Sequence, residues 1–256
     1  MADVKKTLAC IKTKNEISPQ IFDMWLENSE IASKAKPGQF LSIYMKEGSR
    51  LLPRPISICE VDKEQGRLRI VYRIAGKGTA ELSDYAVNDM IEIMGPLGNG
   101  FYMDEVKSAI LIGGGIGIPP MLELAKQLKC KKTIVLGYRD TRFLSDEFAT
   151  YGDVVIATED GSFGTKGNVV DAMNEHHLSA DMIFACGPTP MLRGVKTYAT
   201  EHGIKVQISM EEKMACGIGA CLACVCKSKE KDHHTNVNNK RVCKDGPVFF
   251  ADEIEL

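Results

Sequence analysis

Residues 111–120 read LIGGGIGIPP and form a glycine-rich turn between an apolar run over residues 108–112 and a helical pattern over residues 119–129. Glycines in such a turn let the backbone approach a pyrophosphate, and the start of the following helix offers unpaired N–H groups and the positive end of its dipole. The spacing differs from the G-x-G-x-x-G fingerprint of a Rossmann fold. The stretch predicts a strand, a phosphate-binding turn and a helix, with a purely structural tight turn as the alternative.

Strand and helix patterns alternate on the C-terminal side of this turn. The alternation predicts a parallel sheet with helices on both faces. A second glycine turn, CGPTPM at residues 186–191, again follows a strand and opens a helix. Ligands of open parallel sheets gather at the carboxyl ends of the strands, so the repeat favours a ligand site over a structural turn. The expected strands are residues 132–138, 154–158, 182–186 and, as the last one, 206–210, and the expected helices are residues 145–149, 169–176 and 190–202.

The N-terminal part of the chain has a different pattern, from about residue 4 to residue 94. Short runs rich in Val, Ile, Leu, Phe and Tyr, such as residues 40–45, 67–74 and 90–94, alternate with polar turns. Strands at this spacing predict an all-β barrel or sandwich. The glycine-rich connector GPLGNG at residues 95–100 marks the expected boundary with the α/β part.

Three cysteines near the C-terminus, Cys216, Cys221 and Cys224, have the C-x4-C-x2-C spacing of a plant-type [2Fe-2S] site. The glycines among them suit a loop whose backbone N–H groups point at sulfur. Both Cys226 and Cys243 are candidates for the fourth thiolate, and Cys243 is favoured because the polar stretch before it can form a hairpin and return.

A structural zinc site is the alternative for the same cysteines, with His233 and His234 joining Cys221 and Cys224. The polar stretch over residues 227–240 carries almost no apolar side chain, so the C-terminal tail is too short and polar to bury a core by itself. We therefore expect its fold to depend on the metal.

Composition limits the function classes further. The 256 residues suffice for two domains and a small appendage, and a net charge of -2 gives no reason to expect nucleic acid. The N-terminus lacks the apolar region of a signal peptide and no stretch approaches 18 apolar residues, which predicts a cytoplasmic protein without a membrane span. Nine cysteines, an odd number clustered late in the chain, argue against a disulfide framework.

Together with the two glycine turns, the segment RPIS at residues 54–57 resembles the ferredoxin-NADP reductase superfamily across roughly residues 1–210. A second turn, GKGT at residues 76–79, lies nearby in the sequence. The resemblance implies an N-terminal antiparallel β-barrel that binds FAD and an α/β domain that binds a nicotinamide dinucleotide. It implies FAD contacts from Arg54, Pro55, Ile56, Ser57, Val71, Tyr72, Arg73, Gly78 and Thr79, and NAD contacts from Gly113, Gly114, Gly115, Gly117, Cys186, Gly187 and Pro188.

The appended cysteine motif, with PGQF at residues 37–40 and DGSFG at residues 160–164, makes the whole chain similar to the electron-transfer subunits of type B dihydroorotate dehydrogenases. The resemblance implies an FAD domain over residues 1–100, an NAD domain over residues 101–210 and a small [2Fe-2S] domain over residues 211–256. Cys216, Cys221, Cys224 and Cys243 would hold the cluster.

The expected activity is a relay, in which electrons from dihydroorotate oxidation on a partner FMN subunit pass through the cluster and FAD to NAD+ in pyrimidine biosynthesis. Nothing in the chain resembles a dihydroorotate site, so a catalytic partner is required, and the resemblance implies a heterotetramer of two plus two. The cluster carries one electron at a time and the nicotinamide accepts a hydride, so a flavin must transfer electrons between them.

Other functions remain open from the residues alone. An NAD(P)H:ferredoxin oxidoreductase or sulfide dehydrogenase has the same domains, and a redox sensor or zinc-stabilised binding module could keep the fold without turnover. The choice between NAD and NADP also stays open, because Arg139, Asp140 and Arg142 follow the second strand of the α/β part and include both a cation and an acid.

Overall fold

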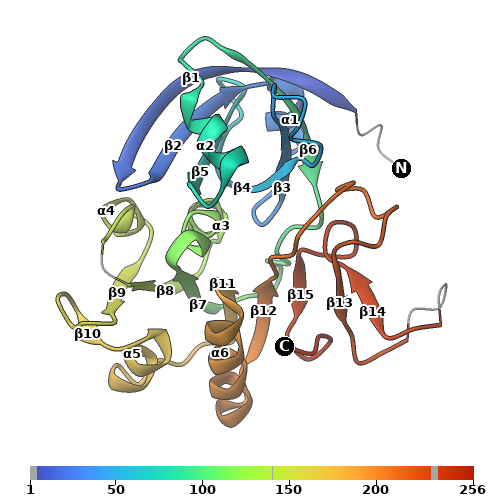
Figure 1. Cartoon of the computed structure of the whole chain (residues 1–256). Helices are drawn as coiled ribbons and strands as arrows, with labels where there is room; N and C mark the ends of the chain where they lie inside the picture. The colour runs from blue at the N-terminus through green and yellow to red at the C-terminus, as the bar shows by residue number, and fades with distance from the viewer. Residues whose placement is uncertain (1–4, 140, 232–235) are drawn as a thin grey trace.

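The computed structural model describes residues 5–139, 141–231 and 236–256. Figure 1 shows a β-barrel above, a sheet flanked by helices below it, and the C-terminal segment beside both. These three parts confirm the expected fold class of a barrel, a parallel-sheet domain and a small C-terminal region.

Six antiparallel strands of the described chain close the barrel in the order β1-β2-β5-β4-β3-β6. Alternate side chains, such as Leu26, Ile43 and Ile70, fill its interior, as a strand period of two requires. Two short helices interrupt the strands, and the second begins where a turn over residues 76–79 was expected. The elements are β1 (Lys6–Ser18), β2 (Ile21–Glu27), α1 (Ser29–Lys34), β3 (Phe40–Tyr44), β4 (Arg54–Asp62), β5 (Arg67–Arg73), α2 (Lys77–Asp84) and β6 (Met90–Leu97).

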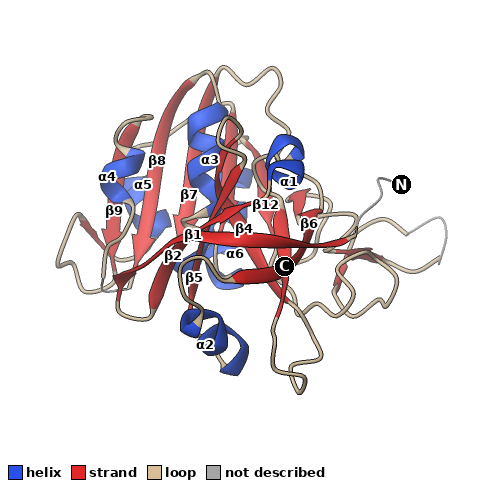
Figure 2. Cartoon of the chain, turned by 90° about the horizontal axis from the view of Figure 1, so that it is seen from above, coloured by secondary structure: helices blue, strands red, loops and turns tan. Residues whose placement is uncertain are grey.

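The second part is a sheet in the order β10-β9-β8-β7-β11-β12-β15 among the described residues, parallel except for β15. Helix α3 packs on the face toward the barrel, and α5 and α6 cover the other face, as Figure 2 also shows. The predicted helices and strands of this part are confirmed. The elements of this part, including η1 and β10 that were not predicted, are β7 (Ser108–Gly114), η1 (Gly115–Gly117), α3 (Pro120–Gln127), β8 (Lys131–Tyr138), α4 (Ser145–Phe148), β9 (Asp153–Thr158), β10 (Thr165–Lys166), α5 (Val169–Glu175), β11 (Met182–Cys186), α6 (Thr189–His202) and β12 (Lys205–Ser209).

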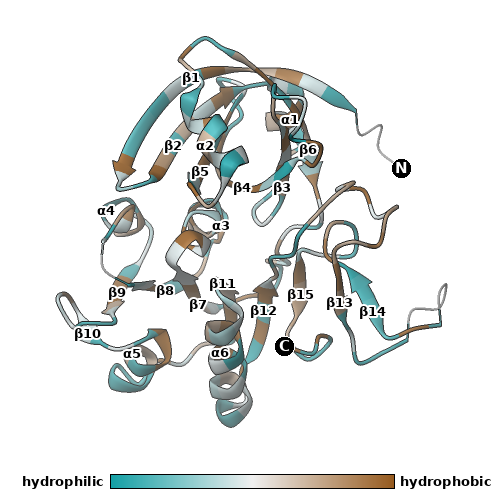
Figure 3. Ribbon diagram, in the orientation of Figure 1, coloured by the Kyte–Doolittle hydropathy of each residue, from teal (hydrophilic) through white to brown (hydrophobic). Residues whose placement is uncertain are grey.

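The C-terminal segment contains a hairpin of β13 (Val225–Lys227) and β14 (Asn239–Arg241), which confirms the predicted return of the chain. The expectation that residues 206–210 form the last strand is wrong. After the hairpin, β15 (Val248–Phe250) adds antiparallel to β12 at the edge of the large sheet. Figure 3 shows the contrast between hydrophilic β14 and hydrophobic β15.

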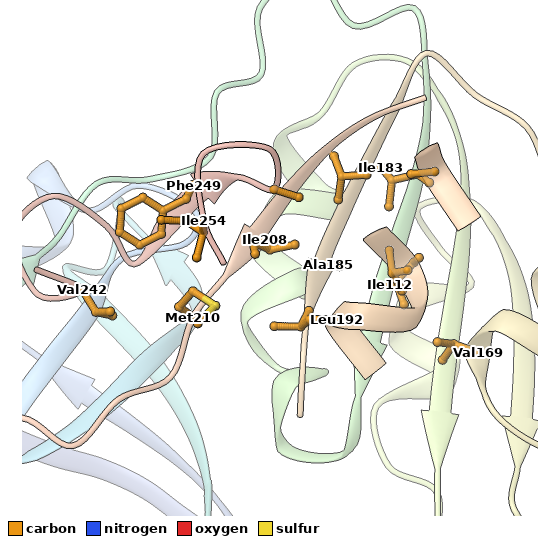
Figure 4. Close-up of a cluster of buried hydrophobic side chains, with 14 of the residues drawn as sticks. Ile112, Val169, Ile183, Ala185, Leu192, Ile208, Met210, Val242, Phe249 and Ile254 are labelled. Carbon is orange, nitrogen blue, oxygen red and sulfur yellow. The ribbon is translucent and has the colours of Figure 1, made fainter. Parts of the chain in front are cut away.

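The core of the C-terminal segment is shared with the α/β part. Val242, Phe249 and Ile254 are buried in one cluster with Ile208 of β12 and Leu192 of α6 (Figure 4). The tail thus buries its few apolar side chains against a neighbour. This sharing provides stabilisation that does not depend on a metal.

Candidate functional site

The two glycine turns lie side by side at the carboxyl ends of adjacent parallel strands, β7 and β11. A Cβ on Gly117 would collide with the Cys186 carbonyl oxygen, and one on Gly114 would collide with Met191 and lie 3.3 Å from Pro188 Cδ. Strands β8 and β9 continue to one side of β7, and β11 and β12 continue to the other. The turns therefore flank the topological switch point, where open α/β sheets bind ligands.

Of the remaining glycines of the two turns, Gly115 leaves room for a ligand to approach the backbone. Gly115 has a φ of +53° and no atom within 4 Å of an added Cβ, whereas Gly187 packs against Met191. Gly113 packs against Ile118, which begins the approach to α3. The 3-10 turn η1 also contacts β5 of the barrel, so the turn faces the strand that carries Val71 to Arg73.

The segment RPIS lies at the start of β4, next to β3, with Pro55 opposite Ser42. Arg54 Nε is buried without a hydrogen-bond partner. A Cβ on Gly78 would collide with the Arg54 guanidinium, so only glycine lets this arginine lie across the start of α2. A half-buried cation beside a helix N-terminus is a site that suits an anionic group such as a diphosphate.

Thr79 lies in the same turn, but its hydroxyl is engaged locally. It accepts hydrogen bonds from the N–H groups of Ala75 at 2.8 Å and Gly76 at 3.2 Å, and it donates to the Gly76 carbonyl oxygen at 3.0 Å. Thr79 therefore fixes the entry to α2. The backbone at Gly78, rather than this hydroxyl, faces Arg54.

The three predicted residues of β5 point in different directions. Val71 is buried in the core between barrel and sheet, and Arg73 is exposed. Tyr72 is 1% exposed and stacks on Phe22 with ring centroids 5.8 Å apart. The Tyr72 hydroxyl has no hydrogen-bond partner, and burial, with the nearby Asp84 carboxylate adding, raises its pKa. Unpartnered buried polar atoms on β4 and β5 fit a polar cofactor lying over these strands.

Four C-terminal cysteines meet in two pairs. Cys221 makes a side-chain hydrogen bond to Cys216, and Cys224 makes one to Cys243, while Cys216 lies close enough to influence the pKa of Cys243. Four thiols arranged as two neighbouring pairs fit a cluster of two irons, each bound by two thiolates. Among the described residues, no three His, Cys, Asp or Glu side chains are arranged as ligands of a single metal ion.

Backbone N–H groups point at these sulfur atoms. Gly219 donates to Cys243 Sγ at 3.1 Å, Ala220 donates to Cys216 Sγ at 3.3 Å, and Cys243 donates to Cys224 Sγ at 3.4 Å. Burial acts to raise the pKa of Cys216, but hydrogen bonds from the N–H groups of Ile218, Cys221 and Ala220 and from the Cys221 side chain lower it to about 6. Burial, with Cys224 close by, raises the pKa of Cys243 to about 12. The loop supplies donors that stabilise thiolates.

Cys226 lies apart from the four. Its thiol donates to the Lys240 carbonyl oxygen at 3.5 Å within the hairpin, and burial, assisted by Glu212, raises its pKa to about 11.

The two histidines of the zinc alternative, His233 and His234, lie outside the described residues, as does Asp140 of the NAD or NADP alternative.

The cysteine loop rests on the barrel. A Cβ on Gly217 would lie 2.9 Å from Ser42 Oγ and 3.4 Å from Met94 Cε, which are on β3 and β6. Ser42 Oγ is buried and has no hydrogen-bond partner, and Ser42 pairs with Pro55 of the RPIS segment. Ser42 could not be identified from the sequence, because a serine in a strand is ordinary. The cysteine loop and the RPIS segment are therefore separated by a single strand.

Family models match all three parts of the chain. An oxidoreductase FAD-binding domain matches residues 9–102, and an oxidoreductase NAD-binding domain matches residues 111–197. The iron-sulfur cluster binding domain of dihydroorotate dehydrogenase B matches residues 211–255. The dihydroorotate dehydrogenase B (NAD(+)) electron transfer subunit of Caldanaerobacter subterraneus subsp. tengcongensis is 41% identical over 250 residues, 97% of this chain and 98% of that protein. The chain belongs to this family of electron transfer subunits.

Other relatives agree with this family. The same-named subunit of Bacillus cereus is 40% identical over 262 residues, covering 99% of this chain and all of the relative. The solved structure of an NADH-dependent reduced ferredoxin-NADP oxidoreductase has a TM-score of 0.87 at 31% identity, covering 97% of this chain and 90% of that one. Phthalate dioxygenase reductase, with a TM-score of 0.64 at 20% identity over 93% of this chain and 94% of that one, shares the fold.

The family fits the site. The chain is an oxidoreductase subunit with binding domains for FAD, NAD and an iron-sulfur cluster. None of the helices in the described part of the chain has the length and apolar character of a membrane span.

Proposed function

We propose that this chain transfers electrons from a catalytic partner that oxidises dihydroorotate on FMN, through a [2Fe-2S] cluster and FAD, to NAD+ in pyrimidine biosynthesis. The observation that carries the proposal is the convergence of three elements on the barrel. The cysteine loop touches β3 at Ser42, the RPIS segment is on the neighbouring β4, and the first glycine turn contacts β5.

Each group of residues has a proposed role. When bound, the cluster carries single electrons, the flavin stores two, and the nicotinamide accepts a hydride. Arg54 and the start of α2 would hold the FAD diphosphate, and the neighbouring strand residues would cover the flavin. The FAD residues are Arg54, Pro55, Ile56, Ser57, Val71, Tyr72, Arg73, Gly78 and Thr79, the NAD residues are Gly113, Gly114, Gly115, Gly117, Cys186, Gly187 and Pro188, and the cluster ligands are Cys216, Cys221, Cys224 and Cys243.

The domains in this proposal span residues 1–100, 101–210 and 211–256, and the protein would work in the cytoplasm. The catalytic partner would assemble with it as two plus two. Two apolar side chains beside the exposed Cys221, Ile218 at 50% and Leu222 at 49% exposure, support docking of the partner over the cluster. An apolar surface at the edge of the cluster would exclude water from the path of the electrons.

Co-purification with the catalytic partner tests the proposal. The complex should convert dihydroorotate and NAD+ to orotate, NADH and a proton under anaerobic conditions, and the partner should contain FMN. Leu222→Asp should weaken the complex in size-exclusion chromatography, whereas Val87→Asp, a matched exposed apolar position on the barrel, should leave it intact. A complex with bound cofactors that forms no NADH from dihydroorotate would refute the proposed activity.

A second candidate is the flavin and iron-sulfur subunit of an NAD(P)H:ferredoxin oxidoreductase or sulfide dehydrogenase. The similarity to the reduced ferredoxin-NADP oxidoreductase along most of both chains favours keeping it. Rapid NADH-dependent reduction of ferredoxin or polysulfide by the purified complex, without dihydroorotate oxidation, would support it instead.

A further inference from the structure

The outer face of strand β3 carries a buried hydroxyl group without a partner. Ser42 is 0% exposed, and its Oγ makes no hydrogen bond to the described part of the chain. A buried polar group in a native protein is expected to have a partner. We propose that the Ser42 hydroxyl donates a hydrogen bond to a sulfur atom of the bound [2Fe-2S] cluster and raises its reduction potential. The inference rests on the proposed function, because it needs the proposed cluster site.

The neighbouring strand residues are poor acceptors for this hydroxyl. Ser42 lies opposite Pro55 of β4 and Met94 of β6, so these side chains share its face of the barrel. The Pro55 side chain is apolar, and Met94 Sδ already accepts from the Tyr44 hydroxyl at 3.9 Å. Phe40, two residues before Ser42, adds a buried ring to the same face. The remaining direction for the hydroxyl is away from the barrel, toward the cysteine loop.

The cysteine loop covers this hydroxyl directly. An added Cβ on Gly217 would lie 2.9 Å from Ser42 Oγ and 3.3 Å from Leu97 Cδ1, so a side chain at this position would fill the space beside the hydroxyl. Gly217 follows the proposed cluster ligand Cys216, and its φ of +71° is one that glycine adopts without strain. The glycine therefore lets the barrel approach the loop immediately next to a ligand.

The ligand itself also lies near this face of the barrel. Tyr44 is two residues from Ser42 on β3, so the two side chains point to the same side. Burial raises the pKa of Tyr44, and the nearby Cys216 thiolate adds to the rise. The loop donates the Ala220 N–H to Cys216 Sγ at 3.3 Å. Ser42 would add a donor to the cluster from the barrel side.

A hydrogen bond to a cluster sulfur has a defined effect on electron transfer. It stabilises the reduced cluster, which carries one more negative charge, more than the oxidised cluster, and so makes the reduction potential more positive. A more positive potential makes the cluster a better acceptor for electrons from the catalytic partner. Loss of the hydroxyl should therefore shift the potential in the negative direction while the ligand set stays complete.

Redox titration of the complete complex, monitored by electron paramagnetic resonance, tests the inference. In Ser42→Ala the ratio of reduced to oxidised cluster at the wild-type midpoint potential should fall about threefold, which is about 30 mV for a one-electron carrier. Electron-nuclear double resonance after exchange into D2O should show one fewer deuteron coupled to the cluster. Iron and FAD contents should match the wild type. Ser18→Ala, at another buried serine of the barrel, serves as the control and should change neither measurement.

The outcomes separate this inference from the function on which it rests. An unchanged cluster midpoint in Ser42→Ala would overturn it, and so would a shifted midpoint with every deuteron coupling retained, because the effect would then be indirect. A shift in the FAD midpoint alone would place the hydroxyl at the flavin instead. Wild-type protein without iron and acid-labile sulfide would overturn the cluster site and this inference together. The expected shift in a complex that does not oxidise dihydroorotate would support the inference and contradict only the proposed function.

Discussion

The α/β part is joined to its two neighbours in different ways. The barrel contacts the α/β part through side chains, namely an apolar layer and a network of ion pairs. Among the described residues, no strand belongs to both the barrel and the large sheet. The cysteine segment is joined to the α/β part through backbone hydrogen bonds, because β15 is the last strand of the same sheet, and the segment and the α/β part also share a hydrophobic core. A shared sheet fixes the cluster loop to the scaffold through backbone hydrogen bonds, whereas the barrel, in the part of the chain that the structure describes, is held to the sheet by side-chain contacts alone.

The barrel junction is centred on Arg69 of β5, which is 7% exposed. Its Nε and Nη2 donate to the two Asp23 carboxylate oxygens at 2.9 Å and 2.7 Å within the barrel, and Nη2 also donates to Glu147 of α4 at 3.0 Å. Burial alone would lower the pKa of Arg69, but Glu147 and Asp23 together raise it. Lys126 of α3 adds an ion pair with Glu60 at 3.0 Å.

Among the predictions that test this comparison of the two junctions, the substitution of a cluster ligand should have the largest effect. Cys243→Ser should remove the visible absorbance of the cluster, because the remaining three thiolates leave one iron with a single cysteine. Cys226→Ser, its matched control in the hairpin, should retain that absorbance together with the iron and acid-labile sulfide. FAD should stay bound in both variants, since the flavin strands belong to the barrel. Full absorbance in Cys243→Ser would contradict the proposed ligand set.

Arg69 gives the next largest effect. Arg69→Met should lower the free energy of unfolding by about 3–5 kcal/mol, because it leaves the Asp23 carboxylate buried without its cation. Arg67→Met, on the same strand, removes only a pair with Glu27 at 3.8 Å that is part-exposed, so its effect should be within about 1 kcal/mol. Denaturant unfolding compares them. Equal losses in the two variants would show that the buried network is not what holds the junction.

The sequence predicted the regular parts of this structure well because their signals are local. The strands and helices from residue 108 to residue 209 follow from apolar periodicity and glycine turns, and C-x4-C-x2-C identified three of the four paired cysteines. Elements that depend on distant partners were missed. Strand β15 is three residues long and forms only against β12. Helix α1 (Ser29–Lys34) was missed for a different reason, because six residues are too few to show a helical period.

The residues of the candidate site also fall into those that the sequence identifies and those that it does not. Glycine turns and cysteine spacing are visible in the sequence, because a close approach or a metal demands those residue types. The contact of the cysteine loop with Ser42 depends on how the loop and the barrel converge in space. No local pattern specifies which serine will meet a neighbour that lies far away in the sequence.

Glu123 of α3 gives the smallest and most selective effect at the barrel junction. It is 2% exposed, and its carboxylate accepts the Val61 N–H of β4 at 2.8 Å. Burial raises its pKa above the ordinary value of 4.5, and Glu60 adds to the rise, while bonds from Gln127 and Val61 and the charge of Lys126 oppose it. Because the folded pKa is raised, the folded state holds this proton more tightly than the unfolded state does.

The contribution of Glu123 to stability is therefore fully present below pH 4.5 and is lost as the pH rises through the raised folded pKa. Glu123→Gln should flatten that part of the curve of unfolding free energy against pH. Asp62→Asn, at the half-buried last residue of β4, serves as the control. A variant whose curve kept the wild-type slope in this window would show that Glu123 does not carry the proton.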